Sequence, residues 1–262
     1  MNLFDRWRQR WARATPADER PGSDRVFDAA IAPDRPLAVI GDVHGMSGLL
    51  DRLLDRLGRD FPEAHVVTVG DYIDRGDGSR GVIERLRPMA EAGTVTCLMG
   101  NHEVMLFEFL AAPDGDAKTW LSRGGLQMLA SYGVGGVVAS SDAATRRDAA
   151  RRLQAAMGSE VDWLRTLPLT YRSGNVHVVH AAADPNRAMD RQQKDALLWG
   201  HPDFDRIDRA DGQWVIHGHS VVDRVEARRG RIPVDTGAYA TGRLSAAVVT
   251  PAGDLEVVEV SA

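Results

Sequence analysis

The chain contains 262 residues, of which 44% are hydrophobic and 26% charged, so it is not a disordered chain and can bury a full core as one large domain. Its net charge of -5 offers no general attraction to nucleic acid or to anionic lipid, so neither is expected as a partner. The single cysteine, Cys97, excludes an internal disulfide, and no signal peptide or run of transmembrane length is visible, which predicts a cytoplasmic protein without a membrane span.

The first 36 residues are expected to precede the main domain. The opening segment MNLFDRWRQRW combines Arg and Trp and predicts an amphipathic docking helix. Residues 14–36 are rich in Pro, Asp and Ala, a composition typical of a connecting segment. We therefore divide the chain into an N-terminal helix and connecting segment, residues 1–36, and one domain, residues 37–262.

Strand and helix patterns alternate from residue 37 onward. Strands are predicted at 37–42, 65–71 and 94–99, and helices at 46–58, at 79–92 and from residue 101. Asp42 and Asp71 are 29 positions apart, and Asp71 and Asn101 are 30 apart, which is the length of a strand-helix-strand crossover. Parallel strands joined in this way end at one edge of a sheet, so the segments GDVHG, GDYIDRG and GNHE should meet there.

The second half of the chain predicts helices and then many short strands. Residues 101–167 carry apolar side chains at helical spacing. Strand patterns follow at 169–173, 176–181, 213–219, 232–237, 243–250 and 255–260. This order predicts a single α/β domain in which two stacked sheets have helices on the outside.

Six side chains at the predicted strand ends are candidate metal ligands. Their carboxylate, amide and imidazole groups, without a thiolate, suit divalent ions such as Mn, Fe, Zn or Mg. Two ions fit this number of ligands better than one, and a carboxylate on the central strand, Asp71, is the natural bridge between them. The other histidines at strands, His65, His177 and His217, are interpreted as structural, with His217 the closest rival to His219. The six candidates are Asp42, His44, Asp71, Asn101, His180 and His219.

Each motif alone also has a simpler interpretation. Asp74 and Arg75 could form a surface ion pair of small energetic value, and Asn101 could cap a helix. It is improbable that all of these interpretations hold at one edge of the sheet.

Together the motifs resemble those of the phosphoprotein phosphatase family of calcineurin-like metallophosphoesterases. The resemblance rests on GDVHG, GDYIDRG, GNHE, His180-Ala181 and the GHS at 218–220, and runs from about residue 37 to the end of the chain. LLW at 197–199 and VDTGA at 234–238 resemble the bacterial and phage members. The implied fold is a metallophosphoesterase sandwich of two mixed β-sheets flanked by α-helices.

The resemblance also implies a role for each site residue. It implies that Asp42, His44 and Asp71 hold one ion, and that Asp71, Asn101, His180 and His219 hold the second. His102 is implied to be the general acid or to orient the hydroxide, with Asp74 as its partner. Arg75 and Asn101 are implied to contact the substrate, and Mn is the favoured metal.

Two positions depart from the family pattern. Ala182 stands where relatives usually have glycine, so the pocket wall beside His180 should differ. Many bacterial relatives have a second phosphate-binding arginine shortly after the tryptophan of LLW, whereas this chain has Gly200-His201-Pro202. The open candidates to replace that arginine are His201, Arg187, Arg191 and Arg206.

The sequence therefore predicts a phosphoesterase with two metal ions that hydrolyses phosphate monoesters by metal-bound hydroxide, most simply a serine/threonine protein phosphatase. Its partner would be a phosphorylated protein or a small phosphoester. The alternatives are a symmetrical diadenosine tetraphosphatase and a phosphate-binding protein without catalysis. The last is opposed by His102 and Asp74, because a binder needs no general acid.

Overall fold

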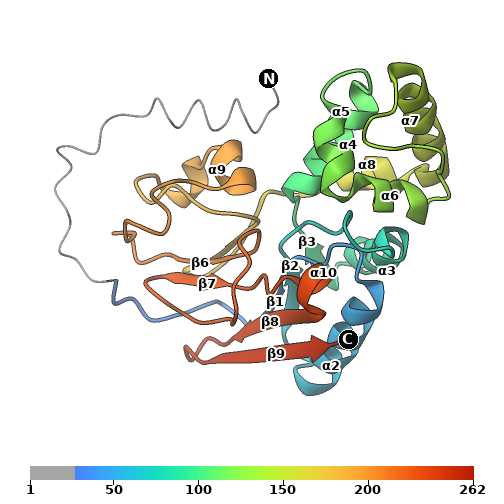
Figure 1. Ribbon diagram of the computed structural model, residues 1–262. Helices are drawn as coiled ribbons and strands as arrows, with labels where there is room; N and C mark the ends of the chain where they lie inside the picture. Colours follow the sequence, from blue (N-terminus) through green and yellow to red (C-terminus); the bar gives the residue numbers. More distant parts are fainter. Residues whose placement is uncertain (1–26) are drawn as a thin grey trace.

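A five-stranded mixed sheet, with strand order β3-β2-β1-β8-β9, is the first of two sheets in the computed structural model, which describes residues 27–262 (Figure 1). β1 pairs in parallel with β2, and β2 with β3. β8 runs antiparallel to β1, and β9 antiparallel to β8. The bounds are Leu37–Ile40 (β1), His65–Thr68 (β2), Val95–Cys97 (β3), Arg243–Val249 (β8) and Leu255–Ser261 (β9).

The second sheet has four strands in the described part of the chain, in the order β4-β5-β6-β7. β5, β6 and β7 are parallel, whereas β4 forms an antiparallel pair with β5. Both sheets are therefore mixed, and each places the carboxyl ends of its parallel strands at one edge. The bounds are Thr170–Ser173 (β4), Val176–Val179 (β5), Trp214–His217 (β6) and Arg231–Pro233 (β7).

The two sheets pack against each other through an aliphatic core. Side chains in β1 alternate, so Leu37 and Val39 join the layer between the sheets while Ala38 and Ile40 face the helices. Burial of both faces explains why this strand is apolar throughout, because such strands read as continuous hydrophobic runs. The layer between the sheets also contains Val67, Val69, Leu98, Val176, Val178, Ile216, Ile232, Val234, Ala247 and Val249.

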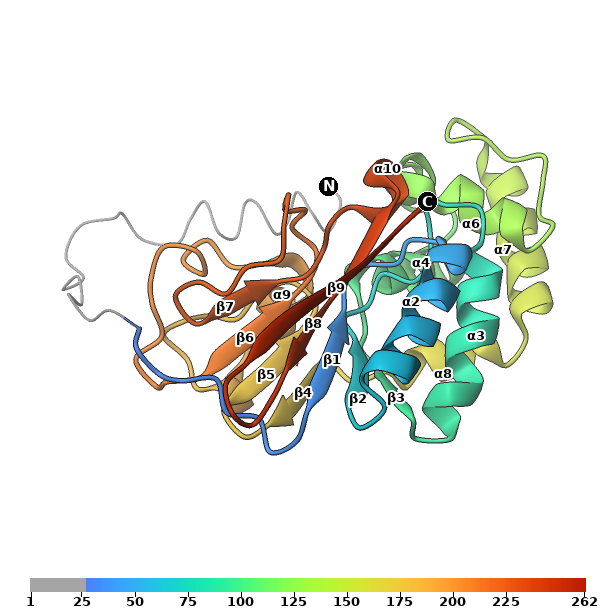
Figure 2. The ribbon, with the colours of Figure 1, turned by 90° about the horizontal axis from the view of Figure 1, so that it is seen from below.

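Helices cover the outer side of each sheet (Figure 2). α2 packs on β8 and β9, and α3 packs on β3 and α2, at the outer face of the five-stranded sheet. α9 lies on the side of the four-stranded sheet. The bounds are Ser47–Asp60 (α2), Ser79–Glu91 (α3), Asn101–Ala111 (α4), Ala117–Trp120 (α5), Leu121–Gly125 (η1), Leu126–Ser131 (α6), Ala143–Met157 (α7), Glu160–Arg165 (α8), Met189–Arg191 (η2), Lys194–Trp199 (α9) and Ala238–Thr241 (α10).

The predicted α/β sandwich is confirmed, with small differences at element ends. α2 continues two residues past Gly58 and ends when the Phe61 N–H donates to the Leu57 carbonyl at 2.8 Å. A glycine near a helix end costs about 1 kcal/mol relative to alanine, which does not stop a helix whose apolar face is buried. α4 begins with Asn101 as its first helical residue, and Gly100 is the N-cap.

The predicted amphipathic helix at residues 1–11 lies outside the described residues. The later part of the predicted connecting segment, residues 27–36, has no helix and borders the four-stranded sheet. Trp214 Nε1–H donates to the Ala29 carbonyl at 2.8 Å, and the Trp214 ring packs edge-on against Phe27. Between residues 27 and 262, no helix combines the length and apolar character needed to cross a bilayer.

Candidate active site

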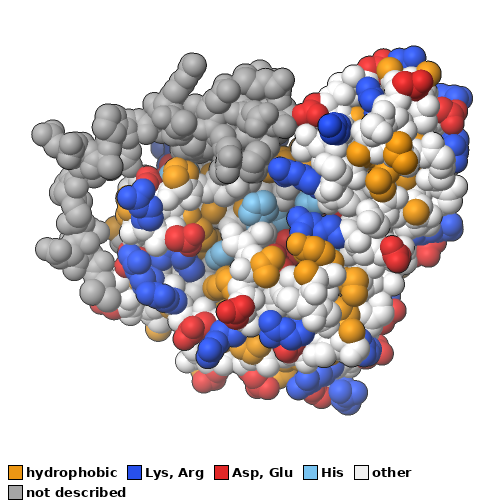
Figure 3. Space-filling view, in the orientation of Figure 1, with side chains coloured by type: hydrophobic (Ala, Val, Ile, Leu, Met, Phe, Trp, Pro, Cys, Tyr) orange, Lys and Arg blue, Asp and Glu red, His pale blue; other side chains and the backbone are white. Residues whose placement is uncertain are grey.

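The six predicted metal-ligand residues lie together where the strand-end loops of the two sheets meet. In Figure 3, histidine side chains are visible in a hollow near the centre of the face, with Lys or Arg side chains beside them. A cavity of about 70 Å³ lies there. Its lining includes Asp42, His44, Asp71, Arg75, Asn101, His102, Arg123, Trp199, His219, Asp235 and Tyr239.

The two carboxylate oxygens of Asp71 face two different histidines. Oδ2 lies 3.5 Å from His44 Nε2, and Oδ1 lies 3.5 Å from His180 Nε2. Nδ1–H of His44 donates to the Ile73 carbonyl at 2.8 Å, and Nδ1–H of His180 to the Val69 carbonyl at 3.0 Å. Each ring therefore turns the lone pair of Nε2 toward Asp71. Acceptor atoms that face one another across this distance fit a cation between them, and Asp71 is placed to serve two cations.

A second group of donors surrounds His180 and His219. Asn101 Oδ1 lies 2.8 Å from His180 Nε2 and 3.0 Å from His219 Nδ1. Asp71, His180 and His219 each place a ligand atom within 4.8 Å of the others, as do His44, Asp71 and His102. His217, the rival to His219, turns toward Phe204 and belongs to neither group. The geometry thus favours His219 over His217 as the ligand.

Asp42 lies in the same cavity and is held by the backbone of the opposite loop. Its two carboxylate oxygens accept the His219 N–H at 3.1 and 3.2 Å. Burial, together with the neighbouring carboxylates of Asp235 and Asp71, raises the pKa of Asp42 well above its usual value. Several buried carboxylates this close together call for positive charge, which divalent ions would provide.

The rings of the three candidate ligands His44, His180 and His219 are neutral at physiological pH, as metal ligands must be. Burial lowers the pKa of His44 to about 3 and that of His219 to about 3. His180 is fully buried, and its pKa is also lowered by burial. The residues present therefore fit two divalent ions with oxygen and nitrogen ligands.

His102 is held by Asp74 on the side away from the ligand cluster. His102 Nδ1 lies 2.6 Å from Asp74 Oδ2, and the same oxygen accepts Trp120 Nε1–H at 2.8 Å. Burial opposes protonation of His102, but the carboxylates of Asp71 and Asp74 outweigh it, so the pKa of His102 is raised. The His102 ring thus presents Nε2 to the cavity and is able to carry a proton there.

Arg75 lines the cavity beside this histidine. Its Nη2 lies 3.5 Å from His102 Nε2, and its guanidinium carbon lies 4.2 Å from the centre of the Tyr239 ring. Tyr239 in turn packs edge-on against His44 with 5.3 Å between ring centres. A guanidinium stacked on an aromatic ring keeps its fork of N–H donors in a defined plane, which suits recognition of an oxyanion.

Backbone strain is concentrated at the site. Six non-glycine residues of the described chain have positive φ, and five of them are His44, Asp71, Asp74, Arg75 and His219. A left-handed conformation costs an ordinary residue about 1–2 kcal/mol. Such strain clusters at functional sites, where it fixes the direction of a side chain.

Several residues at the site escaped the sequence analysis. Glu103, which is fully buried, accepts the N–H groups of Asp71 at 3.0 Å, Tyr72 at 2.9 Å and Gly100 at 3.0 Å. It follows His102 directly in the GNHE segment, so its position was visible but its partners were not. Asp235, two residues after the end of β7, is likewise buried in the site.

The four candidates for a second phosphate-binding cation do not line the cavity, as far as the described residues show. His201 Nδ1 accepts the Asp203 N–H at 3.2 Å, and Arg187 pairs with Asp184 at 3.1 Å. The second arginine of the cavity is Arg123, which no sequence motif indicated.

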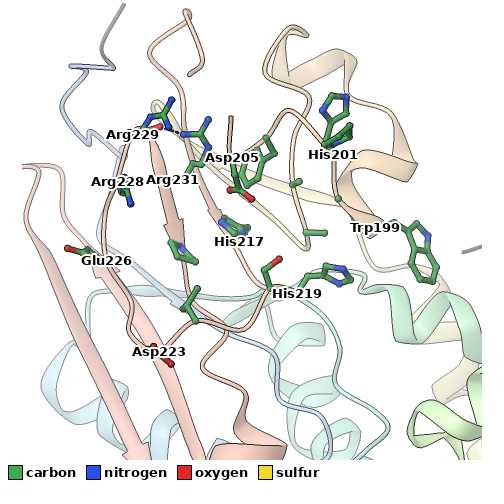
Figure 4. Close-up of a pocket in the computed structure, with 18 of the residues that line it drawn as sticks. Trp199, His201, Asp205, His217, His219, Asp223, Glu226, Arg228, Arg229 and Arg231 are labelled. Carbon is green, nitrogen blue, oxygen red and sulfur yellow. Dashed lines mark hydrogen bonds between the residues drawn. The ribbon is translucent and has the colours of Figure 1, made fainter. Parts of the chain in front are cut away.

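A larger groove of about 950 Å³ adjoins the cavity and shares Trp199 and His219 with it (Figure 4). One wall is the segment from Trp199 to Asp205, and the other is the loop from His219 to Arg229. The cavity is the size of a single oxyanion, whereas the groove has room for a larger group attached to it.

Comparison with known proteins also indicates a phosphoesterase. Residues 35–233 match the family model described as calcineurin-like phosphoesterase. Serine/threonine-protein phosphatase 2 of Escherichia coli is 39% identical over 92 residues, which is 35% of this chain and 39% of the relative. The chain therefore spans only about two fifths of the length of that relative.

A second relative belongs to a different named activity. The symmetrical bis(5'-nucleosyl)-tetraphosphatase of Ralstonia nicotianae is 28% identical over 272 aligned positions, covering 86% of this chain and 94% of the relative. Among solved structures, a serine/threonine phosphatase from Saccharomyces cerevisiae superimposes with a TM-score of 0.56 at 18% identity, covering 88% of this chain and 81% of the other. At this identity, the structural similarity concerns the fold alone.

Proposed function

The chain belongs to the calcineurin-like phosphoesterase family, and from that premise we propose that it is a metal-dependent phosphatase acting on phosphoseryl or phosphothreonyl proteins. The observation that carries the proposal is the position of Asp71, whose two oxygens each face a histidine lone pair, in one cavity with Arg75 and His102. A site built only to bind phosphate would need the arginine but not a histidine held by a carboxylate.

We assign the six ligand residues to two ions. Asp42, His44 and Asp71 would hold one, and Asp71 with Asn101, His180 and His219 would hold the other. Such ions, for which we propose Mn²⁺ over Fe, Zn or Mg, would lower the pKa of a bound water and neutralise charge on the phosphate.

The protein's own groups would bind the phosphate and supply a proton. Arg75 presents parallel N–H donors to two phosphate oxygens and stays protonated throughout. Asn101, at the same cavity, would contact the bound phosphate. The His102 ring, protonated and held through Nδ1 by Asp74, would transfer the proton at Nε2 to the seryl or threonyl oxygen as the P–O bond breaks.

The second candidate function is symmetrical hydrolysis of a dinucleoside polyphosphate. It is favoured by the relative that aligns over 86% of this chain and by the groove next to His219, which has room for a nucleoside. A cytoplasmic location, which the buried and unpaired Cys97 suits, is part of either proposal.

A substrate panel with the Mn-loaded protein separates these functions. Phosphopeptides, diadenosine tetraphosphate and an aryl phosphate should be compared by kcat/KM, with the nucleotide products identified by chromatography. We expect the phosphopeptides to be at least about ten times better than the dinucleotide. A higher kcat/KM for the dinucleotide, with ADP as product, would establish the second function instead. No hydrolysis of any substrate at two bound metal ions per chain would overturn both.

A further inference from the structure

A kink between the helical turns of α5 and α6 brings an arginine to the cavity from outside the sequence motifs. η1 follows α5 directly and contains Arg123 and two consecutive glycines. Gly124 has φ 116° and ψ -2°, so the chain changes direction immediately after Arg123.

The turn is fixed against the loop that carries Arg75. The Arg75 N–H donates to the Gly124 carbonyl at 3.4 Å, and a Cβ on Gly124 would lie 2.3 Å from the Arg75 nitrogen. A Cβ on Gly125 would lie 2.6 Å from the Trp120 ring. Only two glycines allow this approach, so the position of η1 relative to Arg75 has little freedom.

Arg123 lines the cavity from η1, next to the loop that carries Arg75. It is half-buried and borders the same space of about 70 Å³ as Arg75, His102 and the ligand carboxylates. That space is large enough for several waters or for one tetrahedral oxyanion. Two arginines 48 positions apart in sequence thus line one small cavity whose other charged walls are carboxylates and histidines.

We propose that Arg123 is a substrate-binding residue that holds the phosphate group together with Arg75. This inference rests on the proposed phosphatase function and adds a second clamp to it. Two bound divalent ions would neutralise the carboxylates, so that the two arginines would favour binding of a phosphate dianion. A clamp made of two arginines on separate segments fixes the orientation of the phosphate as well as its position.

The test compares Arg123→Gln, Arg123→Lys and the control Lys118→Gln, which removes an exposed cation from the neighbouring helix α5. Binding of inorganic phosphate to the Mn-loaded proteins is measured by calorimetry, and KM and kcat are measured with an aryl phosphate. We expect Arg123→Gln to weaken phosphate binding by about ten- to a hundredfold, the range of one hydrogen bond to a charged group. KM should rise by a similar factor while kcat changes less, because the clamp binds substrate and transition state alike.

The conservative variant separates charge from geometry. Arg123→Lys keeps the charge but loses the planar fork, so it should recover part of the phosphate affinity and not all of it. Lys118→Gln should bind phosphate like the unmodified protein. Phosphate affinity within twofold of the unmodified protein in Arg123→Gln, at equal metal content and unchanged circular dichroism, would overturn the inference. Absence of hydrolysis in every form, with phosphate binding still weakened by the variant, would overturn the phosphatase function but leave the anion clamp in place.

Discussion

The imidazole of His102 and the carboxylate of Asp74 lie 2.6 Å apart, Nδ1 to Oδ2, in a position buried from solvent. Because Nδ1 is occupied by the carboxylate, the proton available for chemistry is the one on Nε2, which faces the cavity. Asp74 Oδ1 has no hydrogen-bond partner among the described residues. The carboxylate is thus committed to His102 and Trp120 through a single oxygen.

Removal of His102 should affect poor leaving groups much more than good ones. A seryl alkoxide is a strong base that needs a proton as it departs, whereas a nitrophenolate departs without one. General acid catalysis contributes roughly a hundred- to ten-thousandfold, so His102→Ala should lose about that factor in kcat on a phosphopeptide and clearly less on p-nitrophenyl phosphate. The comparison requires equal metal content in both proteins. Equal losses on both substrates would assign His102 to orienting the nucleophile instead.

Asp71 should be needed for both metal ions. Asp71→Asn removes the charge that faces His44 and His180, so the bound Mn should fall from two ions per chain toward none. Asp42→Asn, which alters one proposed site, should retain more metal. Loss of activity should exceed the 10–100-fold typical of changes behind the ligands. Metal content by elemental analysis after dialysis checks this, and chelation should abolish activity until Mn is restored. Two tightly bound ions in Asp71→Asn would contradict the bridging role.

The part of the site that could be predicted from sequence is the part built on strand ends. Asp42, Asp71 and Asn101 follow apolar strands at crossover spacing, and parallel pairing brings them to one edge. The choice of His219 over His217 came from the motif resemblance, and the geometry favours the same ligand. Periodicity and spacing suffice to predict the positions of Asp42, Asp71 and Asn101, because each follows a single strand.

Site residues whose positions depend on tertiary packing could not be predicted from periodicity and spacing. Arg123 lies in the kink η1, whose path depends on contacts with Arg75 and Trp120, and neither contact has a local sequence pattern. The SRGG segment carried a weak signal, because two successive glycines indicate an unusual backbone. The pairing of Trp120 with Asp74 joins residues 46 positions apart, through the approach of α5 to the loop between β2 and α3.

Cys97 should be inert in the folded protein. It is 2% exposed, and burial raises the pKa of its thiol to about 11, so at pH 8 only about one molecule in a thousand carries the thiolate. Ellman's reagent should therefore not react at pH 8 until the protein is unfolded in urea.

The raised pKa of Cys97 also means that the unfolded chain loses the thiol proton at a lower pH than the folded chain, so the free energy of unfolding should decline as the pH rises above about 9. The decline should be smaller in Cys97→Ala. In the labelling experiment, rapid reaction of the native thiol would show that Cys97 is accessible.

Glu103 should stabilise the site by holding the ends of β2 and β3 together. One oxygen accepts the N–H groups of Asp71 and Gly100, and the other accepts that of Tyr72. Glu103→Gln keeps the shape but places an amide NH₂ against at least one of these donors. A buried donor left without a partner costs about 1–3 kcal/mol, so the metal-free protein should lose roughly 1–3 kcal/mol of unfolding free energy in urea. The matched control is Glu84→Gln on α3. The Glu84 carboxylate is exposed and pairs with Arg80 at 2.8 Å, so this substitution should change stability by less than about 0.5 kcal/mol.

Because the Asp71 backbone would also be displaced, Mn should bind more weakly to Glu103→Gln and equally well to Glu84→Gln, as measured by calorimetry. Unchanged stability and unchanged Mn affinity in Glu103→Gln would show that the three hydrogen bonds do not position Asp71.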